Sequence, residues 1–305
     1  MPSYTIDTSK FSHLLHDKVV DNFENKFCEY VGAKYACSVN SATNAIFLIF
    51  LNKMLTVNVP SIIPPVVCNG LITGGNKINF VDNVGWVGGS YVLHEFDNYK
   101  VIDSAQKVER NQFSTEANDE DLMIFSFYPT KPVGSCDGGI IVSNDWEKIK
   151  RFKESTLNGM TFSEHNWDRK IKFPGYKMYM NSLQAFIATR NLEILDEKNN
   201  RLSEIRAVYD KSFGLNNTSN HLYRINVINR GELITLMGKD GIQTGIHYGA
   251  LHENTIYNPN FVDYLDLPYS SEEGRTTISL PFHEKMTNQE VNKVINLVKE
   301  NATRS

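Results

Sequence analysis

Residues 35–51 read YACSVNSATNAIFLIFL, and this stretch decides the fold class. Residues 35–39 have the character of a short strand, and residues 40–43 form a polar turn. The apolar run at 45–51 then predicts a helix. A strand, a short turn and a helix start make a βα unit, which is the building block of α/β proteins.

Further short β-rich runs follow along the first half of the chain, with helical or loop stretches between some of them. Upstream, apolar residues at helical spacing predict an amphipathic helix over 19–31. The alternation predicts a mostly parallel central sheet flanked by helices, in which ligands bind at the carboxyl ends of the strands. The strands are expected at 78–81, 100–102, 122–127 and 139–142, and three of these runs end in a polar residue, namely Asp82, Asp103 or Ser126.

The second half of the chain predicts a smaller domain. A long helical stretch over 182–213, broken near residues 199–200, separates the two parts. We therefore expect a large domain over 1–200 and a small C-terminal α+β domain over 201–305. The small domain has predicted strands at 223–227 and 277–280 and predicted helices at 231–239 and 288–300.

Composition narrows the function classes. The 305 residues are 41% hydrophobic, enough for a large core, and the net charge of −4 argues against non-specific binding to nucleic acid or to an anionic membrane. The four cysteines are widely separated, so neither a disulfide framework nor a metal site is expected. The chain also has no apolar run of membrane-spanning length and no leader pattern, and we expect a cytoplasmic protein.

Lys131 lies in the loop that follows the predicted strand over 122–127. Most lysines are solvated surface residues, which is the alternative for this one taken alone. Its neighbours Pro129 and Pro132 restrict the backbone, and the glycine pair at 138–139 permits a close backbone approach. A lysine held there can meet a ligand at the edge of the sheet.

Asp103 directly follows an apolar strand. A turn or helix cap is one explanation, and a buried carboxylate that needs a cation is the other. The protonated ring nitrogen of pyridoxal 5′-phosphate (PLP) is such a cation, and a carboxylate beside it makes the ring a better electron sink. The turn at 40–43 adds a helix start that attracts phosphate, with a plain Ser or Thr cap as the alternative.

Together these elements resemble the DegT/DnrJ/EryC1/StrS family of sugar aminotransferases, within the fold type I PLP enzymes. The resemblance extends from residue 23 to the last predicted helix. It rests on the small-residue turn before Thr43, on the Asp-x-x-Gln element that ends at Gln106, and on the Ser-Phe-x-x-x-Lys element that ends at Lys131.

The resemblance implies PLP as cofactor and Lys131 as the catalytic residue that forms the Schiff base. It implies that Asp103 pairs with the ring nitrogen and that Gln106 contacts the oxygen-bearing side of the ring. The residues that would hold the phosphate are Ala42, Thr43 and Ser126. His247, Tyr248 and His252 resemble the family's substrate entrance, with ordinary surface or packing roles as the alternative for the histidines.

Two departures from the family pattern stand out. Lys177 and Tyr179 replace an Asn and an Arg, and we hypothesise that Lys177 reaches the phosphate of the neighbouring subunit across a homodimer interface. Pro64 lies where the family usually has an aromatic residue that stacks on the cofactor ring. The stacking residue is therefore left open.

The activity implied is transfer of an amino group, with L-glutamate as donor, onto a nucleotide-diphosphate keto-sugar, for amino-sugar or surface-polysaccharide biosynthesis. The sugar dehydratase branch resembles this family but has a histidine in place of the lysine, so Lys131 argues against it. A non-catalytic regulatory or scaffold protein is the alternative from another class. A nicotinamide enzyme is disfavoured because no G-x-G-x-x-G follows a strand.

Overall fold

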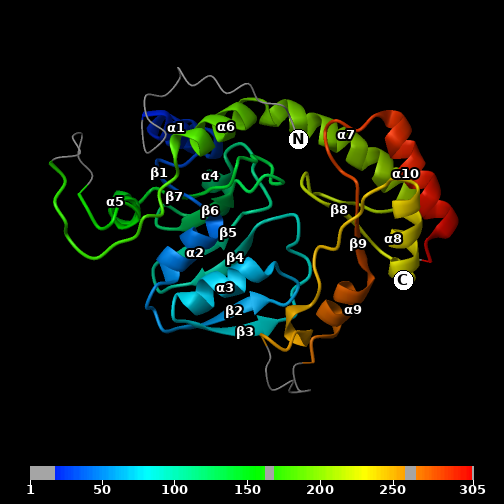
Figure 1. The fold of residues 1–305 in the computed structure, drawn as a ribbon, viewed down its shortest axis with the longest axis horizontal. Helices are drawn as coiled ribbons and strands as arrows, with labels where there is room; N and C mark the ends of the chain where they lie inside the picture. The colour runs from blue at the N-terminus through cyan, green and yellow to red at the C-terminus, as the bar shows by residue number, and fades with distance from the viewer. Residues whose placement is uncertain (1–17, 162–167, 258–265, 304–305) are drawn as a thin grey trace. The chain divides into compact units, whose positions relative to one another are not determined.

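The structure is a computed structural model that describes residues 18–161, 168–257 and 266–303 (Figure 1). The chain divides into two compact units. The first runs through Phe50 and resumes over Val92–Ile194, and the second consists of Leu51–Tyr91 and the chain from Leu195 onward.

A five-stranded sheet forms the centre of the first unit. β5 and β6 are parallel, whereas β7 is antiparallel to both of its neighbours, β6 and β1. The α/β class is confirmed, and the sheet is mixed where a mostly parallel one is predicted, because a loop without a helix joins β6 to β7 and a parallel pair needs a longer crossover. The strands follow in the order β1 (Tyr35–Val39), β7 (Gly139–Ser143), β6 (Leu122–Ser126), β5 (Lys100–Asp103) and β4 (Tyr91–Glu95).

Helices cover this sheet. α1 and α6 pack side by side, and the rings of Phe27 on α1 and Phe125 on β6 meet edge to face with centroids 5.0 Å apart (Figure 1). Such aromatic pairs add to the burial of their apolar area. The helices of the unit are α1 (Lys18–Val31), α2 (Ala42–Phe50), α4 (Gln112–Glu116), α5 (Trp146–Thr156) and α6 (Ser182–Glu193).

The second unit contains two small sheets. β2 (Thr56–Pro60) and β3 (Lys77–Val81) are parallel, and α3 (Pro65–Thr73) packs against β3. β8 (Tyr223–Asn226) and β9 (Thr277–Leu280) are antiparallel. The remaining helices are α7 (Leu195–Phe213), α8 (Arg230–Lys239), the short 3₁₀ helix η3 (Leu251–Glu253), α9 (Pro268–Thr276) and α10 (Asn288–Asn301).

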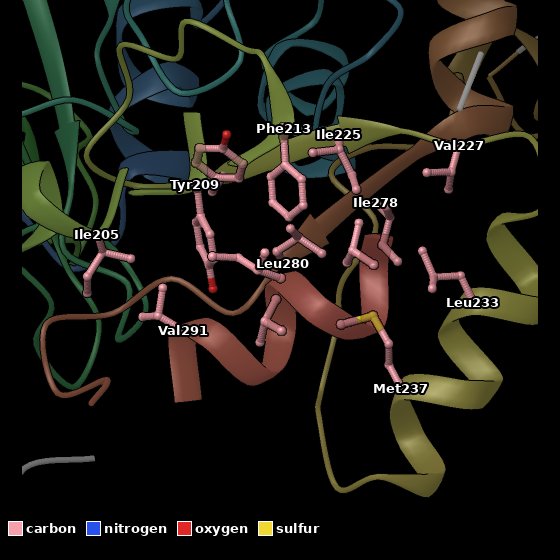
Figure 2. Close-up of a cluster of buried hydrophobic side chains, with 14 of the residues drawn as sticks. Ile205, Tyr209, Phe213, Ile225, Val227, Leu233, Met237, Ile278, Leu280 and Val291 are labelled. Carbon is pink, nitrogen blue, oxygen red and sulfur yellow. The ribbon is translucent and has the colours of Figure 1, made fainter. Parts of the chain in front are cut away.

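The β8–β9 sheet packs on α7, α8 and α10 through one hydrophobic core (Figure 2). Tyr209 and Phe213 come from α7, Ile278 from β9 and Met237 from α8. These side chains are almost completely buried. Full burial of one such side chain stabilises the fold by about 1.5–3 kcal/mol, so this core stabilises the packing of the β8–β9 sheet against its helices.

The predicted break near residues 199–200 is wrong. The helical stretch is interrupted at Ile194, and α7 continues through both asparagines. Asparagine is a weak helix former, but the buried face formed by Leu195, Leu202 and Ile205 outweighs that weak preference.

Residues 51–91 belong to the second unit, although the sequence places them in a large domain over 1–200. The reason is a set of contacts made at the ends of β2 and β3. Leu251 N donates to the carbonyl of Ser61 at 3.0 Å, and the carboxylate of Asp82 accepts hydrogen bonds from Ser270 N and Oγ at 2.7 and 2.6 Å. Two segments far apart in the sequence thus form one unit.

Candidate active site

Asp103 and Ser126 end neighbouring parallel strands, and their side chains share one face of the sheet. Phe125 packs against Phe27 of α1, so the adjacent residues Ile124 and Ser126 point to the opposite face, because side chains alternate along a strand. Asp103 is the register partner of Ile124 and therefore points the same way.

The start of α2 lies on this same face. Gly139 is paired with Ser126, and a Cβ atom on Gly139 would stand 2.6 Å from the backbone nitrogen of Ala42. Only glycine permits this approach. Ser41 precedes the helix, and its Oγ accepts a hydrogen bond from Asn44 N at 3.2 Å. The amide end of α2 is thereby brought next to the end of β6.

The structure thus brings together the three residues predicted to hold a phosphate. Ala42 and Thr43 are partly buried in the first turn of α2, where backbone N–H groups have no partner within the helix. Ser126 is buried, and its Oγ accepts a hydrogen bond from Tyr128 N at 3.3 Å. The arrangement combines a hydroxyl with a helix N-terminus, the donor set that a phosphate group requires.

Asp103 and Gln106 lie inside the protein, 3% and 2% exposed. Asp103 Oδ1 accepts a hydrogen bond from Ala105 N at 2.9 Å, which closes a tight turn directly after β5. A buried carboxylate needs compensation by a cation. Its location is consistent with a partner for a protonated ring nitrogen.

The amine of Lys131 interacts electrostatically with the carboxylate of Asp103. Burial lowers the pKa of the Lys131 amine to about 8, and the nearby carboxylate of Asp103 opposes part of that shift. The amine is still mostly protonated at neutral pH, but it loses its proton far more readily than an ordinary lysine does. A partly buried amine with a lowered pKa is suited to act as a nucleophile and as a proton carrier.

Lys177 is exposed, and the segment around it pairs with the end of β1. Asn40 N donates to the carbonyl of Met178 at 2.8 Å, and Tyr179 bridges to Val39. The segment is thus anchored beside the turn that leads into α2.

The three predicted substrate residues belong to the second unit. His247 Nδ1 lies 2.8 Å from Ser279 Oγ, and the ring of Tyr248 meets the ring of His247 edge to face. His247 also lines a cavity of about 660 Å³, together with His221 and His283.

His252 differs from the other two because its side chain is buried, with 6% exposed. Its Nδ1 lies 2.6 Å from Ser61 Oγ and its Nε2 lies 3.2 Å from Ser271 Oγ. Burial lowers the pKa of His252, against the opposing charges of Glu253 and Asp82. Both ring nitrogens thus already have hydrogen-bonding neighbours within the unit.

Arg224 is a residue that sequence reasoning missed. Its Nη1 donates to the carbonyl of His247 at 3.2 Å and forms an ion pair with Glu273 at 2.6 Å. Arg224 alternates with the buried Tyr223 and Ile225 on the strand Tyr223–Asn226 and so lies on the face away from the core, a position where a charged residue gives no sequence signal of its own.

Pro64 has no aromatic ring that could stack on the ring of a cofactor. It is the residue before α3, with an extended backbone, and Pro65 occupies the first helical turn, a favourable position for proline. The identity of the stacking residue stays open.

A sequence model of the DegT/DnrJ/EryC1/StrS aminotransferase family matches residues 5–68 and 115–299. The chain belongs to this family. The match contains Lys131, the turn at 40–43 and the segment with His247, Tyr248 and His252. The family and the enzyme class inferred from the sequence are confirmed.

Individual relatives agree with this assignment. The chain is 26% identical to the UDP-4-amino-4,6-dideoxy-N-acetyl-β-L-altrosamine transaminase of Campylobacter jejuni, with 88% of this chain and 86% of the relative covered. Its fold is similar to that of PseC of Helicobacter pylori, an aminotransferase involved in the biosynthesis of pseudoaminic acid, at a TM-score of 0.78, 19% identity and coverage of 96% and 94%. It is also similar to NtdA of Bacillus subtilis with bound PMP, the pyridoxamine form of the cofactor, at a TM-score of 0.79, 18% identity and coverage of 94% and 77%.

None of the helices in residues 18–161, 168–257 and 266–303 has the length and apolar character needed to cross a membrane. Over the same ranges, no group of three or more His, Cys, Asp or Glu side chains is placed to hold a metal ion.

Proposed function

We propose that this protein is a PLP-dependent sugar aminotransferase that transfers an amino group onto a nucleotide-linked keto-sugar. The observation that carries the proposal is the shared sheet face on which Asp103, Ser126 and the start of α2 lie, with Lys131 close enough to Asp103 to feel its charge. The name of the Campylobacter jejuni relative, a transaminase of a UDP-linked sugar, supports the substrate class.

The residues present fit PLP. Asp103 provides a buried carboxylate for the ring nitrogen, Lys131 an amine of lowered pKa for the aldehyde carbon, and Ser126 with the N-terminus of α2 the donors for the phosphate. Gln106 is buried just after the turn that Asp103 forms, and we assign it to the oxygen-bearing side of the ring.

When bound, PLP supplies an electron sink for the negative charge that develops as an amino acid loses its α-proton. Asp103 would hold a proton on the ring nitrogen through its charge. Lys131, with a pKa of about 8, would accept the α-proton of the donor at Nζ and later release it. In the net reaction the donor's amino group and the oxygen of the sugar carbonyl change places, so the donor becomes a keto acid and the sugar becomes an amino-sugar.

The substrate side of the proposal rests on the second unit. We assign His247 and Tyr248 to direct contact with the sugar substrate, since both are partly exposed and His247 lines a cavity. For His252, we propose that contact with substrate is secondary to its hydrogen bonds with Ser61 and Ser271. L-glutamate is proposed as the amino donor by family resemblance.

We further propose a homodimer in which Lys177 contacts the cofactor phosphate of the partner. Its exposure supports this role, because a side chain that crosses an interface must be exposed on the single chain. A Lys177→Ala protein is expected to release PLP more readily than wild type, and equal retention would refute the assignment. A cytoplasmic location is supported by the four cysteines, all of which are unpaired.

A non-catalytic regulatory or scaffold protein is the alternative carried from the sequence, and the comparisons do not favour it. The proposed activity is tested by loading the protein with pyridoxamine phosphate and adding a panel of UDP-linked keto-sugars. Mass spectrometry should detect an amino-sugar and regenerated PLP. If no keto-sugar is aminated while an α-keto acid is, the protein is an aminotransferase with a different acceptor.

A further inference from the structure

Helix α6 is hydrogen-bonded to the loop that contains Lys131. The side-chain amide of Asn191 donates to the carbonyl of Gly134, and Ser135 Oγ donates to the carbonyl of Gln184 at 2.7 Å. Ser135 is buried, with 6% exposed, so its hydrogen bond is shielded from water. The far end of the loop is therefore fastened to α6 at two points.

The loop is also closed on itself. Lys131 N donates to the carbonyl of Tyr128 at 2.8 Å, and Ser135 N donates to the carbonyl of Phe127 at 2.8 Å. Gly134 has no room for a Cβ atom, because the carbonyl of Pro129 occupies that space. A compact loop of this kind moves as one body, so its position depends on what holds its end.

The same helix is hydrogen-bonded to the turn that begins α2. Gln184 Nε2 donates to the carbonyl of Asn40 at 3.4 Å. Its Oε1 accepts from Asn181 N at 3.1 Å as part of the capping box that starts α6. One side chain thus connects the helix start with the turn at 40–43.

Gln184 and Asn191 lie about two helical turns apart, so both leave α6 on the same face, about 10 Å from one another along the axis. A helix is a rigid spacer over this length. The Lys131 loop and the turn at 40–43 are both hydrogen-bonded to this face, so the helix keeps their separation constant. A variant that loses one of these hydrogen bonds can let one segment shift without the other.

We propose that Asn191 and Gln184 are positioning residues, through which α6 sets the separation between the Lys131 loop and the phosphate-binding turn. Asn191 holds the loop and Gln184 holds the turn. The proposal rests on the proposed function in one respect, namely that the turn binds the cofactor phosphate.

Three variants separate the two roles. Asn191→Leu removes the amide at similar volume. Gln184→Met removes the donor to Asn40 at similar volume and adds no charge, while the side chain of Asn181 still accepts from the backbone nitrogen of residue 184. Arg190→Ala is the matched control on the same helix, since Arg190 is exposed and its ion pair is with Glu193 on the surface.

Two measurements go with them. The first uses cofactor-free protein and follows the modification of Lys131 by an amine reagent against pH, with the Lys131 peptide quantified by mass spectrometry. The second compares the dissociation constants of PLP and of pyridoxal, which lacks the phosphate. The PLP dissociation constant divided by the pyridoxal dissociation constant reports on phosphate binding by the turn at 40–43. The pH midpoint of the modification reports on the surroundings of the Lys131 amine.

Asn191→Leu should move the midpoint upward from about 8 toward the ordinary lysine value of 10.5, because a loosened loop admits water to the amine. It should leave the PLP-to-pyridoxal ratio near that of wild type. Gln184→Met should raise the PLP-to-pyridoxal ratio of dissociation constants by roughly three- to tenfold, the effect of one hydrogen bond, and leave the midpoint unchanged. Arg190→Ala should match wild type in both.

The proposal is overturned if folded Asn191→Leu and Gln184→Met proteins match Arg190→Ala in both measurements. Ser135→Ala removes the other bond between loop and helix, and it should shift the midpoint in the same direction, so it decides the case if Asn191→Leu does not fold. If wild type itself binds PLP no better than pyridoxal, the proposed cofactor site fails. If wild type shows the preference and the variants keep it with an unchanged midpoint, only the positioning roles fail.

Discussion

The carboxylate of Asp103 acts on the amine of Lys131 in the opposite direction to burial. Burial lowers the pKa of Lys131, the negative charge of Asp103 raises it, and the balance stands at about 8. Asp103 ends β5, and Lys131 lies in the loop after β6. The two strands are parallel neighbours in the sheet. Asp103 thus has two roles in the proposed reaction, one toward the cofactor ring and one toward the lysine.

Replacing Asp103 by asparagine separates charge from shape. We expect Asp103→Asn to slow the half-reaction with L-glutamate by about 100-fold, the scale of a lost preorganised electrostatic contact. The pKa of Lys131 should fall below 8, because the charge that raises it is gone. Stopped-flow absorbance of the PLP-loaded protein measures the half-reaction, and modification of Lys131 against pH in cofactor-free protein measures its pKa. Asp97→Asn, an exposed aspartate of the same unit, is the control. An unchanged pH profile would contradict the coupling between Asp103 and Lys131.

The buried thiols predict a loss of stability in alkali. Burial, with a smaller contribution from the charge of Glu24, raises the pKa of Cys28 and Cys37 from 9.0 to about 12. The folded state therefore keeps these thiols neutral while the unfolded chain ionises above pH 9, so the stability they contribute is present below pH 9 and is lost as the pH rises toward 12. Each thiol should lower the free energy of unfolding by about 1.4 kcal/mol per pH unit in that window.

Thermal unfolding between pH 8 and 11 with a reductant present measures this effect. A Cys28→Ala/Cys37→Ala protein should lose stability less steeply above pH 9 than wild type does. Parallel curves for the two proteins would show that the thiols do not ionise differently on unfolding.

His252 predicts a loss of stability on the acid side. Its pKa is lowered in the folded state by burial, so protonation favours the unfolded chain. The stability is present above the ordinary histidine pKa of 6.5 and is lost as the pH falls through that value. His252→Phe should remove this acid dependence and also cost about 1–3 kcal/mol for each of the two serine hydroxyls left without the ring nitrogens.

Urea unfolding at pH 5, 6 and 7.5 checks the prediction for His252. His221→Phe, at a partly exposed histidine of the same unit, is the control. An acid dependence that persists in His252→Phe would place its origin in other groups.

The sequence carries most of the information for the proposed cofactor site because that information is local. Asp103 and Ser126 are the last residues of their strands, Lys131 lies in the loop after Ser126, and strand ends meet at one edge of a sheet. The turn at 40–43 is placed by the βα pattern on either side of it. That Asp103 and Ser126 lie on the same face of the sheet could be established only from the pairing register of β5 and β6, which the structure provides.

Other features could not be read from local pattern. The fastening of the Lys131 loop by Asn191 joins residues with no periodic relation, and the amide of an asparagine gives no signal in sequence alone. The assignment of residues 51–91 to the second unit depends on hydrogen bonds at Ser61 and Asp82 with partners far along the chain. β7 is antiparallel to β6 because the segment 127–138 that joins them is a loop. A helical crossover in that segment would have allowed a parallel pair.

The most direct test of the account is the absorption spectrum of the purified protein with PLP, before and after addition of L-glutamate, with Lys131→Ala beside it. We predict a cofactor band that requires Lys131 and that shifts on addition of L-glutamate, as PLP is converted to its pyridoxamine form. A wild-type protein without any Lys131-dependent band would contradict the central claim and would bring back the regulatory or scaffold alternative.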